Sequence, residues 1–179
     1  MKEVYYQIIS DGYDKKSGNL YAPDDWPYPI TTAGKEVKDW DKLEVELRDG
    51  EYAPYHNCVS RANMVSEELK ALLEEYIGEN ENIEFLPVKA KSKEYGDRTY
   101  YILHFRNKPE DVISEPHSDY YNGHVLRYAL DYDKVKGKKI FNVKDEDIHV
   151  SADIAKAIKK RKLTGGMELA PIASLSSDE

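Results

Sequence analysis

Two groups of residues in this sequence combine side chains that could carry out chemistry. His56 and Cys58 are two positions apart, and a histidine beside a cysteine can activate a thiolate nucleophile. No third residue that would orient such a pair is evident, so we interpret Cys58 as a structural thiol. His117, Asp119 and His124 could ligate a metal ion and support hydrolysis, but their spacing matches no standard zinc site. The second interpretation, a small metal-dependent hydrolase, is kept as an alternative.

The sequence motifs of the common enzyme classes are absent. There is no Gly-rich phosphate loop, no His-Glu-x-x-His motif, no cysteine pair and no Gly-x-Ser-x-Gly nucleophile motif. The basic run at 159–162 could contact phosphate, but cations at the end of a helix also favour its dipole. We therefore expect no catalytic residue, no cofactor and no metal, and a protein that is not an enzyme.

Aromatic side chains indicate binding. The chain has 15 tyrosines, including doublets at 5–6, 100–101 and 120–121, and tyrosine and tryptophan are enriched at protein interfaces. Doublets inside a strand serve a sheet equally well, so the aromatic residues in predicted loops are the better candidates. The residues predicted to contact a partner are Trp26, Tyr28, Tyr120 and Tyr121, with Glu74 and Glu75 as an acidic rim.

Charge limits the kind of partner. The chain has 26 Lys and Arg against 34 Asp and Glu, a net charge of −8. Phosphate binding depends on clustered Lys and Arg, so this balance argues against a nucleic-acid partner and is compatible with a basic protein. No apolar run approaches the roughly 20 residues of a membrane span. A single cysteine and a first segment with no secretory cleavage pattern predict a cytoplasmic protein.

Two similar segments organise the second part of the chain. Residues 150–172 predict a helix with Ser151 at its N-cap and Gly165 or Gly166 at its end, followed by a short strand. Residues 65–88 repeat the pattern at an offset of 85, and after a one-residue gap both segments finish on Glu-x-x-Pro followed by Val or Ile. Two copies are too few for a solenoid, so the repeat predicts a pseudo-symmetric pair within one domain.

The remaining elements complete the predicted fold. Strands are expected at 4–9, 43–48, 98–105 and 139–143, and loops at 52–63 and 107–123. The fold class predicted is α+β: one domain with a mixed or antiparallel sheet and two pseudo-duplicated, Ser-capped helix–strand modules. The domain is expected to span 1–172, with an irregular, strand-containing part at 1–62 and the duplicated part at 63–172. Residues 173–179 are expected to form a flexible tail.

The order of these motifs resembles a known family. The segments V-S-E-E-L-K-A-L-L, I-E-F-L-P-V, T-Y-Y-I-L-H-F, I-H-V-S-A-D-I-A-K-A-I and L-T-G-G-M-E-L-A-P-I are similar to the bacterial immunity-protein family numbered eleven, of polymorphic toxin systems. The resemblance covers residues 64–172. Gly166-Met167-Glu168 and Leu169 stand where bulkier apolar residues and phenylalanine are expected.

The resemblance implies a cytoplasmic antitoxin that binds a cognate, possibly basic, toxin protein without cofactor or turnover. Its motifs define the core of the fold, so they assign no binding residue. An intracellular adapter without a toxin partner is the remaining alternative to this function and to the hydrolase.

Overall fold

A computed structural model describes residues 3–24, 34, 37, 40, 43–57, 62–78, 82–108, 111–122, 124–143 and 147–176. The strands of the first half are β1 (Glu3–Ser10), β2 (Asn19–Tyr21), β3 (Leu43–Arg48), β4 (Tyr55–Asn57), β5 (Asn63–Ser66), β6 (Ile83–Lys91) and β7 (Arg98–Phe105). Those of the second half are β8 (Asp119–Tyr121), β9 (His124–Arg127), β10 (Leu130–Asp131), β11 (Ile140–Val143), β12 (Asp147–Ser151) and β13 (Met167–Leu175). The helices are α1 (Glu67–Glu74), α2 (Tyr132–Val135), α3 (Ala152–Lys160) and a short 3-10 turn at Glu115–His117.

Strands dominate the fold, so the α+β prediction is wrong. The chain is 49% strand and 16% helical, which makes the class mostly β. Each Val-Ser pair ends a short buried strand, β5 or β12, which was not predicted, and each helix begins directly after its serine N-cap, as predicted. The segments expected to be loops also contain strands, namely β4 and β8.

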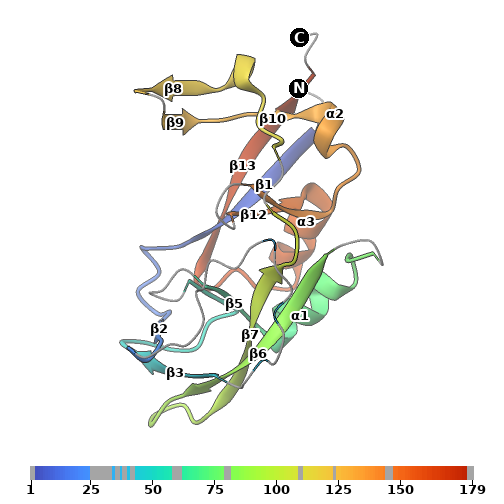
Figure 1. Cartoon of the computed structure of the whole chain (residues 1–179). Coiled ribbons are helices and arrows are strands. Elements are labelled where there is room, and N and C mark those ends of the chain that lie inside the picture. The colour runs from blue at the N-terminus through green and yellow to red at the C-terminus, as the bar shows by residue number, and fades with distance from the viewer. Residues whose placement is uncertain are drawn as a thin grey trace.

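The described strands form three sheets (Figure 1). The first has the order β2-β3-β6-β7-β5-β4, and contact between its edge strands β2 and β4 nearly closes it into a barrel. The second has the order β10-β13-β1-β12-β11. The third is the hairpin of β8 and β9, which projects at one end of the molecule in Figure 1.

The two large sheets are built on the same plan. The order β3-β6-β7-β5-β4, which we call the first unit, matches β10-β13-β1-β12-β11, the second unit. In both units the first pair is parallel and the other three pairs are antiparallel. Strand β1 precedes all the other strands of both units in the chain, and in the second unit it holds the place that β7 holds in the first. The repeated element is therefore a five-stranded sheet carrying one helix.

Strand register extends this equivalence to single residues. Ser66 pairs with Tyr100 across β5 and β7, and Ser151 pairs with Tyr5 across β12 and β1. Pro87 pairs with Tyr101, and Pro171 pairs with Tyr6. The tyrosine doublets at 5–6 and 100–101 thus occupy equivalent positions, and the shared Glu-x-x-Pro endings lie beside them.

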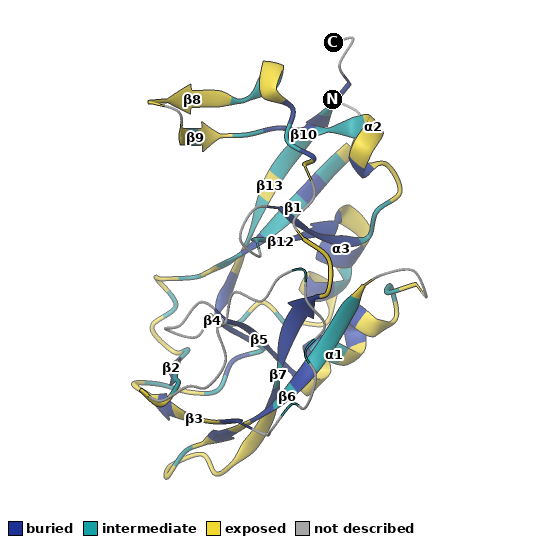
Figure 2. Cartoon of the chain, in the orientation of Figure 1, coloured by how far each residue is buried: buried dark blue, intermediate teal, exposed yellow. Residues whose placement is uncertain are grey.

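The central core lies where the two units meet. Helices α1 and α3 pack against each other on one side of the molecule, and their apolar faces are buried (Figures 1 and 2). Equivalent residues of the two units share this core; the pairs are Ile8 and Leu103, Tyr55 and Ile140, Val65 and Val150, Leu69 and Ile154, and Leu73 and Ile158. Two smaller cores fill the barrel and the corresponding face of the second sheet.

The ends of the helices differ in detail from the prediction. The Ser66 hydroxyl accepts a hydrogen bond from the Leu69 amide at 3.3 Å, as an N-cap does. The Ser151 hydroxyl instead donates to the Asp153 carboxylate. Helix α3 ends at Lys160 with Arg161 as its C-cap, and the left-handed residue that follows is Lys162, with φ of 59°, rather than a glycine. Strand β13 includes residues 173–175, which the sequence had assigned to the tail.

Candidate partner-binding surface

The β8–β9 hairpin exposes apolar side chains to an unusual degree. Its two strands pair with each other and with no other described strand. Tyr120 and Tyr121 are 46% and 65% exposed, and Leu126 on the opposite strand is 70% exposed. Figure 2 shows almost the whole hairpin as exposed, in contrast to the buried centre of β7. Large apolar side chains gathered on one projecting element are typical of an interaction site.

Local sequence explains why a hairpin forms here. Tyr121 pairs with His124, so the chain reverses direction between them, and Asn122 lies in this turn. Asn122 adopts a positive φ of 50°, as a turn that matches the strand twist requires. Asn-Gly between two short runs of β-prone residues is a strong hairpin signal, and the sequence analysis missed it by assigning 107–123 to loop.

Hydrogen bonds fix the base of the hairpin, which we call the neck. The Ser118 hydroxyl donates to the Ser114 carbonyl at 2.7 Å and accepts from the Ala129 amide at 3.2 Å. The Ser114 amide in turn donates to the Ala129 carbonyl at 2.9 Å. Leu130 and Val112, just below, are buried in the second sheet's own core. The neck therefore holds an exposed hairpin on a packed base.

The residues predicted to contact a partner do not form one surface. Trp26 and Tyr28 lie outside the described residues. Glu74 and Glu75 lie at the C-terminal end of α1, in the first unit, whereas the hairpin projects at the top of the molecule, away from α1 (Figure 1). Both glutamates already have partners. Glu74 pairs with Lys70 at 2.6 Å, and Glu75 forms a two-pronged ion pair with Arg161 at the end of α3.

The predicted metal ligands are not brought together. His117 Nδ1 lies 2.9 Å from the Ser114 hydroxyl in the neck. Asp119 pairs with Arg127 at the base of the hairpin, whereas His124 pairs with Tyr121 beside the turn. In the part of the chain that the structure describes, no group of three His, Cys, Asp or Glu side chains is placed to hold a metal ion. Cys58, the other candidate, lies outside the described residues.

Two buried histidines have structural roles. His56 Nε2 accepts a hydrogen bond from the Ala53 amide at 3.0 Å, and burial lowers the pKa of His56 to about 4. His149 Nδ1 lies 3.0 Å from the Asp147 carbonyl, which can only accept, so Nε2 accepts from the Tyr128 hydroxyl at 2.8 Å. Burial lowers the pKa of His149 to about 4 as well. Both rings are neutral at pH 7 and serve as hydrogen-bonding core residues.

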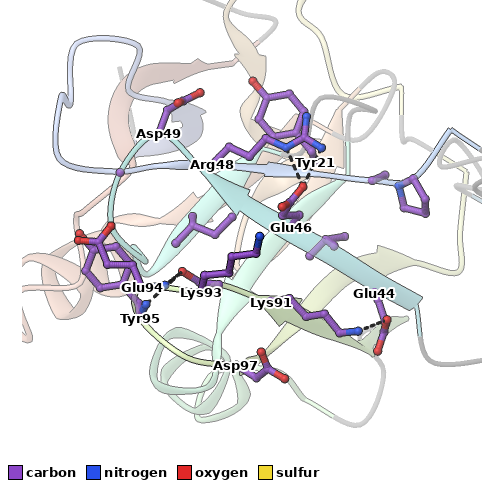
Figure 3. A pocket seen from close by; sticks show the side chains of 16 residues that line it. Tyr21, Glu44, Glu46, Arg48, Asp49, Lys91, Lys93, Glu94, Tyr95 and Asp97 are labelled. Carbon is purple, nitrogen blue, oxygen red and sulfur yellow. Dashed lines mark hydrogen bonds and ion pairs between the residues drawn. The ribbon is translucent and has the colours of Figure 1, made fainter.

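A groove of about 870 Å³ opens between β3 and the β6–β7 turn (Figure 3). Four of its charged side chains form two ion pairs with one another. Arg48 donates to Glu46 at 2.8 Å and lies 4.6 Å from the Tyr21 ring centre, and Lys91 pairs with Glu44. Because the two charges in each pair cancel, we assign the groove no ligand.

Comparisons with known proteins add no family. No protein-family model and no curated protein matches this chain. None of the described helices is both long enough and apolar enough to cross a membrane.

Proposed function

We propose that this protein is an immunity protein that neutralises a bacterial toxin by direct binding in the cytoplasm, with the β8–β9 hairpin as its main contact. One observation carries the proposal: Tyr120, Tyr121 and Leu126 are exposed on one hairpin, whose strands pair with no other described strand. Tyrosine is among the residues that most often dominate binding energy at protein interfaces. The resemblance of residues 64–172 to immunity family eleven supports the identity of the partner.

The neck suits this role because it orders the hairpin before binding. An interface element that is already ordered loses less conformational entropy when its partner arrives. The hydrogen bonds of Ser114 and Ser118 supply that order without covering the aromatic side chains. The net charge of −8 would in addition speed association with a basic toxin. Neutralisation then needs only occlusion of the toxin, with no cofactor and no turnover.

The test uses the product of the neighbouring gene as the candidate toxin. Tagged protein is co-expressed with that product, and both complex formation and rescue of growth are measured. The hairpin variants are Tyr121→Ala and Leu126→Ala. The matched control is Tyr13→Ala, because Tyr13 is 93% exposed and lies outside the hairpin. We expect the wild type and the control to form a one-to-one complex and restore growth.

Each hairpin variant should weaken binding about tenfold or more, as truncation of an interface anchor does. All three variants should retain the thermal stability of the wild type, since the residues are exposed. If the hairpin variants bind the toxin as tightly as the wild type does, the contact with the toxin lies on another face of the protein. A neighbour that is neither toxic nor bound would contradict the immunity function itself.

A further inference from the structure

The two units differ along one edge of the second sheet. In the first unit, strand β3 together with Val37 and Trp40 lies along the outer edge of β6. In the second unit, β10 pairs with β13 only at Ser174 and Leu175. Residues 167–172 of β13 pair with β1 on one side and with no described strand on the other. In the part of the chain that the structure describes, this stretch of strand edge is therefore open.

Strand register shows where the corresponding chain segment has gone. Val45 in β3 and Leu130 in β10 are equivalent, because each pairs with the residue three places after the proline of its Glu-x-x-Pro ending. Five residues earlier in the chain stand Trp40 in the first unit and Val125 in the second. Trp40 contacts the edge of β6, whereas Val125 lies on β9 and pairs with β8. The segment that would cover the edge of β13 thus forms the projecting hairpin instead.

Both ends of the Glu-x-x-Pro sequence are occupied in the first unit. The Glu84 carboxylate accepts a hydrogen bond from the Val37 amide at 3.3 Å, and the Pro87 carbonyl accepts from the Trp40 indole at 2.8 Å. The Trp40 ring is partly buried and packs against the core of the barrel. Glu-x-x-Pro on β6 is therefore a docking site for a segment in which a tryptophan follows three residues after an amide donor.

The same two acceptors face solvent in the second unit. Glu168 and Pro171 are exposed, whereas their equivalents Glu84 and Pro87 are partly covered. None of the described residues donates a hydrogen bond to the Glu168 carboxylate or to the Pro171 carbonyl. The second unit thus repeats the acceptors of the docking site without the segment that fills it in the first unit.

The backbone of β13 adds a donor at this edge. The Asp11 amide donates to the Gly166 carbonyl at 3.1 Å, so even-numbered residues of β13 bond toward β1 in the antiparallel register. Leu169 therefore directs its amide and carbonyl away from β1, toward the open edge. Pro171 lies on the same side, where the missing amide costs no bond to β1. Open strand edges of this kind pair with extended segments of other chains.

We propose that the edge of β13 binds an extended segment of the partner protein that carries a tryptophan. The tryptophan indole donates to the Pro171 carbonyl, the Glu168 carboxylate accepts an amide three residues earlier in that segment, and Leu169 pairs with its backbone. Only residues 128 and 129 separate β9 from β10, so one partner can contact the hairpin and this edge together. A second copy of the chain fits less well, because its Trp40 is already bound to its own β6. That the partner is a toxin rests on the function proposed above.

The test uses the full chain and a synthetic peptide with the sequence of residues 34–44, which contains the Val37-x-x-Trp40 spacing. We expect the peptide to bind with a Kd below about 1 mM in calorimetry, and the same peptide with Trp40→Ala to bind about tenfold more weakly. In the protein, Glu168→Ala should also weaken binding about tenfold, because the segment loses a carboxylate acceptor. The matched control is Glu94→Ala, an exposed glutamate in the β6–β7 turn, which should leave binding unchanged.

Amide hydrogen exchange locates the bound peptide. The Leu169 amide should exchange about tenfold more slowly in the complex, whereas the Ala170 amide, which bonds to β1 in both states, should be unaffected. No binding at 1 mM peptide, or equal binding to the Glu168→Ala variant, would overturn the proposal. So would a dimer of the full chain that Glu168→Ala abolishes, because the edge would then belong to a second copy. If the peptide binds as expected but the neighbouring gene product does not, the docking site is supported and the immunity function is contradicted.

Discussion

Tyr5 and Tyr100 make the same hydrogen bond from equivalent positions in the two units. The Tyr5 hydroxyl donates to the Val135 carbonyl and the Tyr100 hydroxyl donates to the Ala53 carbonyl, each at 2.6 Å. Both rings are buried, and each lies edge-on to an aromatic ring at an equivalent position, Phe141 for Tyr5 and His56 for Tyr100. Each tyrosine thereby ties the middle of its sheet to the segment that leads into its edge strand, β11 or β4.

These two hydroxyls should stabilise the fold to a similar extent. Tyr5→Phe and Tyr100→Phe each leave a backbone carbonyl without its donor in a buried place, so each should lower the free energy of unfolding by about 1–3 kcal/mol. Urea denaturation of the two variants measures this. Tyr13→Phe is the control, because Tyr13 is almost fully exposed, and it should have no effect. If only one of the two variants lost stability, the two tyrosines would be equivalent in position but not in their contribution to the free energy of unfolding.

Gly166 is required by close contact as well as by its backbone conformation. Its φ is 74°, and an added Cβ would overlap the Tyr55 carbonyl. Gly137 has a similar φ of 78° but nothing within 4 Å of an added Cβ. Gly137→Ala should therefore cost about 1–2 kcal/mol for conformation alone. Gly166→Ala should cost about 1–3 kcal/mol more, because β4 must move. Urea midpoints of the two variants give the comparison, and equal losses would contradict the close contact.

Much of the fold was predictable from local patterns in the sequence. The alternation at 43–48 and the run at 98–105 correspond to β3 and β7. The offset of 85 between Val65-Ser66 and Val150-Ser151 places residues that prove equivalent in strand register. These predictions were correct because the burial of a strand determines which of its side chains are apolar. That pattern can be read from residues that are close in the sequence.

The fold class and the pairing of the strands could not be predicted from local sequence patterns. Strand β1 lies between β12 and β13, about 140 residues or more away in the chain, and nothing local in Glu3–Ser10 indicates those neighbours. Ser66 and Ser151 were predicted as helix N-caps, but the short buried strands that end on them, β5 and β12, were not predicted. Of the site, Tyr120 and Tyr121 were predicted from residue type, but Leu126 was not, because a single leucine carries no sign of exposure. The pocket of about 490 Å³ beside β11 is lined by residues from separate segments of the chain, so the spacing of residues in the sequence could not predict it.

The two buried histidines should make stability depend on pH. Burial lowers the pKa of both His56 and His149 to about 4, against about 6.5 in the unfolded chain. Between these values the unfolded chain binds more protons, so stability is full above about pH 6.5 and falls as the pH drops toward 4. Each histidine should contribute on the order of 2–3 kcal/mol to this loss.

Urea midpoints measured from pH 7 to pH 5 test this dependence, since most carboxylates stay ionised in that window. A variant carrying both His56→Gln and His149→Gln should have a flatter profile than the wild type, whatever its absolute stability. The control is His124→Gln, an exposed histidine on the hairpin, which should keep the wild-type slope. An unchanged slope in the double variant would mean that other groups cause the acid sensitivity.

The neck should determine how well ordered the hairpin is without determining the stability of the whole protein. Ser118→Ala removes two hydrogen bonds of the neck, those with the Ser114 carbonyl and the Ala129 amide. The hairpin amides should then exchange with solvent about tenfold faster, which corresponds to roughly one lost hydrogen bond. Unfolding of the two units should be unaffected, because the hairpin pairs with neither of them.

Ser92→Ala is the matched control for this experiment. The Ser92 hydroxyl accepts from the Glu94 and Tyr95 amides in the exposed β6–β7 turn, so its loss should speed exchange in that turn alone. If Ser118→Ala left hairpin exchange unchanged, the order of the hairpin would come from its own strand pairing. If it speeds exchange as expected, the same variant should also weaken partner binding while every aromatic contact residue remains in place, because an element that is disordered before binding must be ordered during it.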